Sequence, residues 1–265
     1  MSTLAHEPPP HAQDSAAHPT WRAPLLWRFL LRVLRILVPA FCRIRISGDI
    51  PTRLRRGPLI VVSNHIGTFD PFVLMVAAAR IGLHPRFLAT GGMFTAPLFG
   101  AIMRGCGHIR VDRGHHRVTD ALDHATGALA EGSCIIIYPE GAITLDPGLW
   151  PQRGKTGAAR LALASRAPVI PVAQWGAHEI MAWDQPLRMA WTLLTALIRR
   201  PVAKVHFGEP IHLTRSVPVP APRPATDTIM RRCADLLPGL RPDEPHLPRH
   251  IDPVRPLSTA KTLGR

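Results

Sequence analysis

The sequence has few cysteines, and their spacing argues against two kinds of site. Among 265 residues there are only four, Cys42, Cys106, Cys134 and Cys233, with no CxxC or CxxH pair. A zinc site is therefore not expected, and neither is a disulfide framework, which is typical of small secreted chains. Cys134 adjoins the apolar run 135–137, so we interpret it as a core residue and expect a reducing compartment.

Long apolar runs are also missing. No stretch of about 18 uncharged apolar residues occurs, so a conventional membrane-spanning helix is not expected. Residues 1–20 are rich in Pro, Ala and His and lack the apolar core of a signal peptide. We predict a disordered tail there.

Acidic residues are scarce relative to basic ones, which gives a formal net charge of +14. Nine arginines but only one acid, Asp49, lie between Arg22 and Arg56. This imbalance indicates an anionic partner: a membrane surface, a nucleic acid or a phosphorylated substrate. The hydrophobic content of 46% excludes a wholly disordered protein, and the length suffices for one large α/β domain with a core.

Segment 21–40 has the pattern of a basic amphipathic helix. On a helical wheel Arg28, Arg32 and Arg35 fall within one narrow arc, and the remaining surface is Leu, Ile, Val, Phe and Trp. This pattern predicts a helix that lies in the interface of an anionic bilayer, with its arginines toward the head groups. The alternative is an ordinary helix packed on the domain. Nucleic acid is not expected as a partner, because the apolar face is wide and no nucleic-acid-binding motif is present.

Strand and helix patterns alternate along the rest of the chain, which predicts an α/β fold with a mixed central sheet flanked by helices. We divide the chain into the tail 1–20, the membrane-contacting helix 21–40, a domain over 41–213, and a Pro/Arg-rich extension over 214–265 with one short helix. Strands are expected at 43–48, 59–62, 86–90, 107–113, 133–138, 169–173 and 202–207, and helices at 71–80, 93–103, 118–131, 157–166, 180–200 and 226–237.

The stretch from Leu59 to Phe72 holds the first candidate site residues. An apolar, β-branched run ends in a polar cluster with His65, and Asp70-Pro71 follows as the expected N-cap and first residue of a helix. His65 is the best candidate for a general base, with Asp70 fixing its tautomer across the loop. Because no serine or cysteine nucleophile belongs to this pair, a hydroxyl of the substrate is expected to attack. The alternative is a capping aspartate beside a structural histidine.

Two arginines end the short strand expected at 107–113. Arg110 and Arg113, with Asp112 between them, can bind an anion if their loop faces the site. Their alternative is a surface ion pair.

Glu140-Gly141 follows the most hydrophobic strand, where open α/β sheets bind ligands. Gly141 allows close approach of a substrate, and Glu140 can orient a donor, hold Arg113, or simply end the strand. Arg153 and Lys155 then open the next helix, a place that favours phosphate.

Four segments carry a family resemblance when taken together. Asn64-His65-Ile-Gly-Thr-Phe-Asp70 has the form NHxxxxD, and it is followed in order by segments 107–113 (GHIRVDR), 138–141 (YPEG) and 167–173 (APVIPVA). They resemble the four motifs of the glycerophospholipid acyltransferase family, in its 1-acylglycerol-3-phosphate acyltransferase or PlsC-like group. The resemblance covers roughly residues 45–212.

The resemblance implies transfer of an acyl chain from a thioester, acyl-CoA or acyl carrier protein (acyl-ACP), to the hydroxyl of a lysophospholipid. The expected acceptor is 1-acylglycerol-3-phosphate, which gives phosphatidic acid. His65 would take the acceptor's proton while Asp70 orients it, and no acyl-enzyme would form. No metal and no further cofactor is implied, because a thioester already carries a good leaving group. The implied substrate-binding residues are Asn64, Gly67, Arg110, Arg113, Glu140, Gly141 and Lys155.

One segment departs from the family pattern. Residues 140–143 read Glu-Gly-Ala-Ile, whereas the family commonly has Glu-Gly-Thr-Arg. Either Arg110, Arg153 or Lys155 takes over the acceptor phosphate, or the acceptor is a different glycerolipid. A non-catalytic lipid-binding protein of the same fold is a further alternative, against which the intact pair His65 and Asp70 argues. We expect a peripheral or monotopic protein on the cytoplasmic face of the cell membrane.

Overall fold

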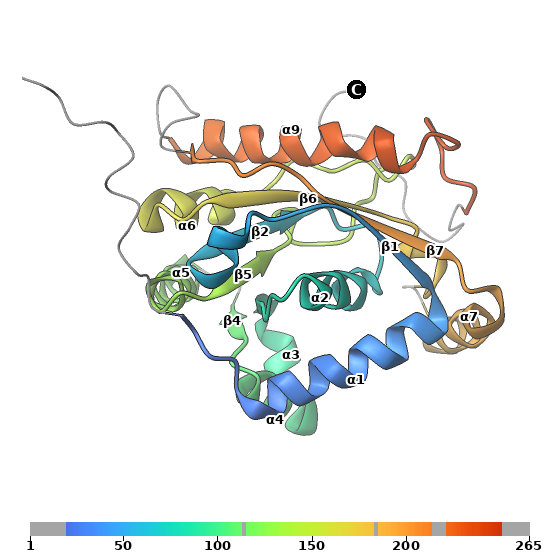
Figure 1. Ribbon diagram of the computed structural model, residues 1–265, viewed down its shortest axis with the longest axis horizontal. Helices are drawn as coiled ribbons and strands as arrows, with labels where there is room; N and C mark the ends of the chain where they lie inside the picture. Colours follow the sequence, from blue (N-terminus) through green and yellow to red (C-terminus); the bar gives the residue numbers. More distant parts are fainter. Residues whose placement is uncertain (1–19, 113–114, 183–184, 214–220, 251–265) are drawn as a thin grey trace, which may run out of the picture.

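The computed structural model describes residues 20–250 apart from 113–114, 183–184 and 214–220, and it confirms the predicted α/β class (Figure 1). Its centre is a seven-stranded sheet in the order β1-β7-β6-β2-β5-β3-β4. The sheet is mixed, because β6 and β7 pair antiparallel while the other neighbours pair parallel. The strands are β1 (Arg43–Gly48), β2 (Leu59–Ser63), β3 (Arg86–Thr90), β4 (Ile109–Val111), β5 (Cys134–Ile137), β6 (Val169–Trp175) and β7 (Val202–Phe207).

Helices cover both faces of this sheet. In Figure 1, α6 and α9 lie above the sheet and α1 and α2 lie below it. The α-helices are α1 (Leu25–Phe41), α2 (Asp70–Arg80), α3 (Gly91–Thr95), α4 (Pro97–Gly105), α5 (His115–Ala130), α6 (Gly157–Ser165), α7 (Pro186–Arg199) and α9 (Pro222–Leu240), and η1 (Thr52–Arg56) and η2 (Ala177–Glu179) are short 3₁₀ helices.

Strand β2 shows why the central strands read as continuous apolar runs. All five of its residues are buried. Val61 belongs to the core under α1 and α2, whereas Ile60 and Val62 belong to the core under α5, α6 and α9. Side chains of a strand alternate between faces, so a strand covered on both sides can be apolar at consecutive positions, as β2 is from Leu59 to Val62.

The C-terminal helix α9 is longer than the predicted helix over 226–237 and packs on the sheet. It begins at Pro222, in the first turn, where a missing N–H costs no intrahelical bond. Ile229, Cys233 and Leu237 are buried in the core. Helix α9 therefore contributes to the folded domain. The predicted division of the chain between 213 and 214 stays a prediction.

The predicted basic helix is present as α1, and it uses two apolar faces. Trp27, Leu31 and Val38 are buried, and the indole N–H of Trp27 donates to the carbonyl of Pro85 at 3.0 Å. Another face leaves large hydrophobic side chains exposed, among them Leu25, Phe29 and Ile36. Within the described part of the chain, no helix is long and apolar enough to cross a membrane.

Candidate active site

His65 and Asp70 are in contact in the loop between β2 and α2. Nδ1 of His65 lies 2.9 Å from Oδ2 of Asp70. The same oxygen accepts the backbone N–H groups of Ile66 at 2.5 Å and Gly67 at 2.9 Å. Asp70 is fully buried, whereas the His65 side chain is 17% exposed. With Nδ1 held by the carboxylate, Nε2 is the nitrogen left to exchange a proton with a ligand.

Asp70 does not cap its own helix, contrary to the sequence prediction. Helix α2 begins at Asp70, the capping position belongs to Phe69, and no side chain caps the helix. The carboxylate turns back onto the loop because His65, Ile66 and Gly67 present three N–H donors to it. Pro71, predicted as the first residue of the helix, is its second residue and still lies in the first turn.

Glu140 stabilises the loop that contains His65 by a hydrogen bond to its backbone. One carboxylate oxygen accepts the backbone N–H of His65 at 2.9 Å, and the other accepts the N–H of Gln152 at 2.8 Å. Burial raises the pKa of Glu140 to about 8, although these two N–H donors act in the opposite direction. Both side-chain oxygens of Glu140 therefore accept backbone hydrogen bonds. Arg113, which Glu140 was predicted to hold, lies outside the described residues.

Tyr138 orients the imidazole, a role that the sequence did not reveal. Its ring stacks on His65 with centroids 4.4 Å apart and planes at 24°. The side-chain amide of Gln174 donates to the Tyr138 hydroxyl at 3.2 Å and to Oγ of Ser63 at 3.1 Å. The sequence did contain a signal for this contact, because Tyr138 is an aromatic residue at the end of the strand next to β2. Adjacent parallel strands place the residues at their ends side by side.

Asn64 and Gly67 both have structural partners, and their predicted contacts with substrate stay a prediction. Asn64 is fully buried, and its amide accepts the N–H of Gln174 at 2.7 Å and donates to the carbonyl of Gln174 at 3.1 Å. These bonds extend the pairing of β2 with β6. Gly67 packs so closely on His178 that an added Cβ would lie 3.0 Å from its Cα.

A cationic cleft of about 720 Å³ lies beside Glu140. Arg153 and Lys155 line it, and so does Arg223 of α9, which donates to the carbonyl of Gly154 at 2.9 Å. Lys155 lies across Gly141, whose φ of +72° and lack of a Cβ make room for it: an added Cβ would lie 2.7 Å from Nζ. The structure thus brings together Glu140, Gly141 and Lys155. Arg223 was not predicted, because it comes from a distant segment with no motif of its own.

Arg110 is not brought to His65. It lies on the edge strand β4 and forms an ion pair with Asp112 at 2.8 Å, with 45% of its side chain exposed. Strands β5 and β3 lie between β4 and β2, so the distance from β4 to β2 is about 14 Å at ordinary strand spacing. The structure shows the surface ion pair that was the alternative for Arg110.

Among the described residues, neither Ser63 nor a cysteine is placed as a nucleophile for His65. Ser63 is fully buried and its hydroxyl donates to the carbonyl of Asn64 at 3.2 Å. All four cysteines are buried. The described part of the chain also holds no group of three His, Cys, Asp or Glu side chains placed to bind a metal ion.

Comparison with known proteins places the chain among acyltransferases. It is 29% identical over 125 residues to a chloroplastic 1-acyl-sn-glycerol-3-phosphate acyltransferase of Brassica napus, covering 47% of this chain and 35% of that protein. It is 31% identical over 144 residues to a 1-acyl-sn-glycerol-3-phosphate acyltransferase of Limnanthes douglasii, covering 53% and 47%. The chain thus spans less than half the length of these relatives.

The fold has a counterpart among solved structures. The crystal structure of the 1-acyl-sn-glycerophosphate acyltransferase PlsC from Thermotoga maritima matches with a TM-score of 0.57 and 18% identity, covering 80% of each chain. This likeness concerns the fold. The family model described as Acyltransferase matches residues 43–175, half of the chain, and this segment contains His65, Asp70, Tyr138 and Glu140. The chain belongs to the acyltransferase family.

Proposed function

We propose that this protein transfers an acyl chain from acyl-CoA or acyl-ACP to the hydroxyl of 1-acylglycerol-3-phosphate, giving phosphatidic acid. The main support for the proposal is the His65–Asp70 pair, which has a proton-accepting nitrogen, while Ser63 and the four cysteines are buried in the described part of the chain. The names of the relatives from Brassica napus and Limnanthes douglasii support the choice of acceptor.

In the proposed reaction His65 acts as general base. Nε2 takes the proton of the acceptor hydroxyl while the oxygen attacks the thioester carbonyl. The carbon–sulfur bond then breaks, and the imidazolium returns the proton to the leaving thiolate. Asp70 stabilises the imidazolium that forms in between. No acyl-enzyme is needed, and no cofactor takes part.

The cationic cleft supplies the acceptor's phosphate site. Lys155 and Arg153 are exposed cations at its wall, and Glu140 connects that wall to the backbone of His65. Two cations here replace the arginine that the family commonly has where this chain has Ile143. A phosphate held by Lys155 leaves the glycerol hydroxyl on the side of His65.

The membrane-facing surface, in this proposal, is formed by α1, α4 and α7. These helices lie along the lower side of the molecule in Figure 1. Each exposes large apolar side chains, for example Phe29 at 58%, Leu98 at 77% and Trp191 at 67%. Exposed apolar surface next to arginines fits a bilayer interface, which supports peripheral association with a membrane. Association with the cytoplasmic face is part of the proposal.

Substitution His65→Ala tests the general base. We expect release of free thiol from acyl-CoA, with 1-acylglycerol-3-phosphate as acceptor, to fall by roughly 10²- to 10⁴-fold. The matched variant Ser63→Ala is expected to keep the activity, because a buried hydroxyl does not attack. Thiol release that survives in folded His65→Ala protein, or that is lost in folded Ser63→Ala protein, would contradict the assignment.

Substitution Lys155→Met tests the phosphate site. We expect the KM for 1-acylglycerol-3-phosphate to rise by about tenfold, as for loss of one charge-assisted hydrogen bond, with a smaller change in kcat. Arg160→Met removes an exposed cation of α6 that does not line the cleft and serves as the control. Equal KM values for the two variants would show that the phosphate lies elsewhere.

The pKa of Glu140 predicts a pH dependence of stability. Since its folded-state pKa of about 8 lies above the ordinary value of 4.5, its contribution is full below pH 4.5 and is lost as the pH rises toward about 8. We expect the urea midpoint of the natural protein to fall over this window relative to that of Glu140→Gln, which cannot ionise. The exposed Glu131→Gln is the control. A constant difference between the natural protein and Glu140→Gln across this pH range would refute the prediction.

If α1 contacts the bilayer, the double variant Phe29→Ser/Ile36→Ser is expected to bind vesicles about tenfold more weakly than the natural protein. Each substitution removes an apolar side chain that would be buried in the bilayer. Both residues are exposed, so the fold is expected to persist. Cosedimentation with anionic vesicles measures the effect, and Leu247→Ser, at an exposed leucine that belongs to none of these helices, is the control. Unchanged binding of the double variant would place the membrane contact elsewhere.

A further inference from the structure

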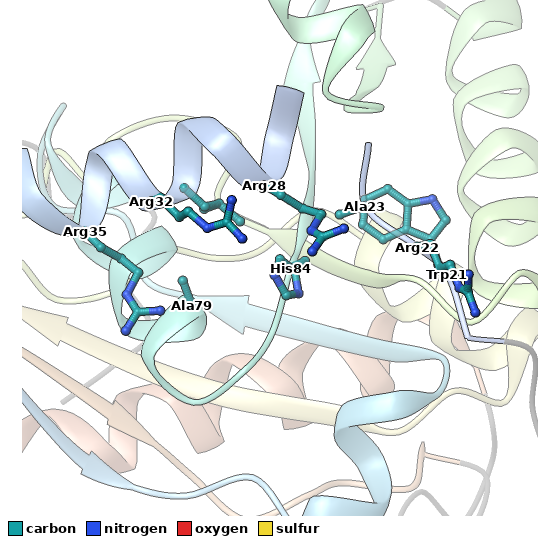
Figure 2. Close-up of a pocket in the computed structure, with 9 residues that line it drawn as sticks. Trp21, Arg22, Ala23, Arg28, Arg32, Arg35, Ala79 and His84 are labelled. Carbon is teal, nitrogen blue, oxygen red and sulfur yellow. The ribbon is translucent and has the colours of Figure 1, made fainter. Parts of the chain in front are cut away.

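A second basic hollow, of about 530 Å³, lies far from His65. It is lined by Trp21 and Arg22, by Arg28, Arg32 and Arg35 of α1, and by Ala79 and His84 at the end of α2 and beyond. Figure 2 shows the three α1 arginines extending from one side of the helix toward the segment that carries Ala79 and His84. Ala79 stands nine residues after Asp70, or about 14 Å along α2, so the hollow and His65 lie at opposite ends of that helix.

The positive charge of this hollow is uncompensated within the structure. In residues 20–250, as far as they are described, the side chains of Arg22, Arg28, Arg32 and Arg35 form no ion pair or hydrogen bond. None of the described residues that line the hollow is acidic. Burial lowers the pKa of His84, and Arg28, Arg32 and Arg35 lower it further. All three arginines are thus close enough to His84 to act on it electrostatically.

Another basic hollow provides an internal comparison. Arg86, Arg104 and Arg110 line a space of about 220 Å³, but each of them has a partner. Arg86 donates to the carbonyl of Gly107, Arg104 to that of Phe94, and Arg110 pairs with Asp112. Arginines with structural partners stabilise the fold, whereas the arginines near His84 have their donors available to an anion.

The donors near His84 fit a phosphomonoester best. Such a group has up to two negative charges and three terminal oxygens, and the planar guanidinium fork binds phosphate oxygens in pairs. A carboxylate or a phosphodiester offers a single charge and two terminal oxygens to four arginines.

The position of the arginines indicates that the anion belongs to a lipid. On α1, the arc with Arg28 and Arg32 adjoins the exposed apolar face of Leu25, Phe29 and Ile36. A lipid whose acyl chains contact that face has its head group at the level of the arginines.

We propose that the hollow between α1 and His84 binds the phosphomonoester head group of a membrane lipid, at a site separate from acyl transfer. The proposal rests on the membrane placement of α1 given under Proposed function. Substrate and product of the proposed reaction both carry such a head group. The site therefore directs the protein to membrane regions rich in them.

Vesicle flotation of the full chain, without acyl donor, tests the site. Vesicles of phosphatidylcholine with either phosphatidic acid or phosphatidylglycerol are prepared at equal measured zeta potential. We expect about tenfold tighter binding to phosphatidic acid, the effect of one or two charge-assisted bonds. Arg28→Gln/Arg32→Gln is expected to lose this preference, whereas Arg53→Gln/Arg56→Gln, which removes two exposed arginines elsewhere, keeps it. Equal binding of the natural protein to both vesicles, or a preference that survives in Arg28→Gln/Arg32→Gln, overturns the proposal.

Two further measurements separate this site from the other proposals. Inorganic phosphate is expected to reduce the preference more than sodium chloride at equal ionic strength, and an equal effect of the two salts overturns a phosphate site.

The variants have their own controls. Arg28→Gln/Arg32→Gln removes like charges and is expected to fold, which thermal unfolding checks. Arg35→Gln is a second variant that is expected to lose the preference for phosphatidic acid. Phe29→Ser/Ile36→Ser weakens binding to both vesicles alike, so a failed membrane surface differs from a failed phosphate site. A failed acyl transfer leaves these binding results unchanged.

Discussion

The buried carboxylate of Asp70 determines the shape of the loop on which the candidate site depends. One of its oxygens accepts Nδ1–H of His65 and the backbone N–H groups of Ile66 and Gly67. Each of these donors would cost roughly 1–3 kcal/mol if it were buried without an acceptor. The loop therefore closes around the carboxylate, which holds Nδ1 of the imidazole and leaves Nε2 outside this contact.

The parallel pairing of β2 with β5 adds the second half of the site. Residues that follow these strands meet at the same edge of the sheet, so Tyr138 stacks on the ring of His65 and Glu140 accepts its backbone N–H. The raised pKa of Glu140 shows that its burial is costly. Such a cost is common where a protein holds a functional group in one geometry. The same residue also borders the cationic cleft, which joins the proposed base to the proposed phosphate site.

Helix α2 connects this site to the surface proposed to bind the bilayer. Its first residue holds His65, its last turns border the arginine hollow, and α1 packs against it. A short rigid helix between the two sites fixes the distance between proposed acyl transfer and proposed lipid head-group binding. The two apolar faces of α1 follow from this arrangement, since one face packs on the domain and the other stays exposed.

Local sequence patterns were sufficient for the alternation of strands and helices, the fold class and the contact of His65 with Asp70. Apolar periodicity reflects burial directly, and five residues across one strand-to-helix loop leave few alternatives. Tertiary structure alone decided that Asn64 bonds to Gln174 of β6, that Arg110 stays on an edge strand, and that Arg223 reaches the cleft. These outcomes depend on the order in which distant strands and helices pack, which a local pattern does not encode. The sequence by itself thus determined which residues have the chemistry, and the packing of the sheet decided which of them meet.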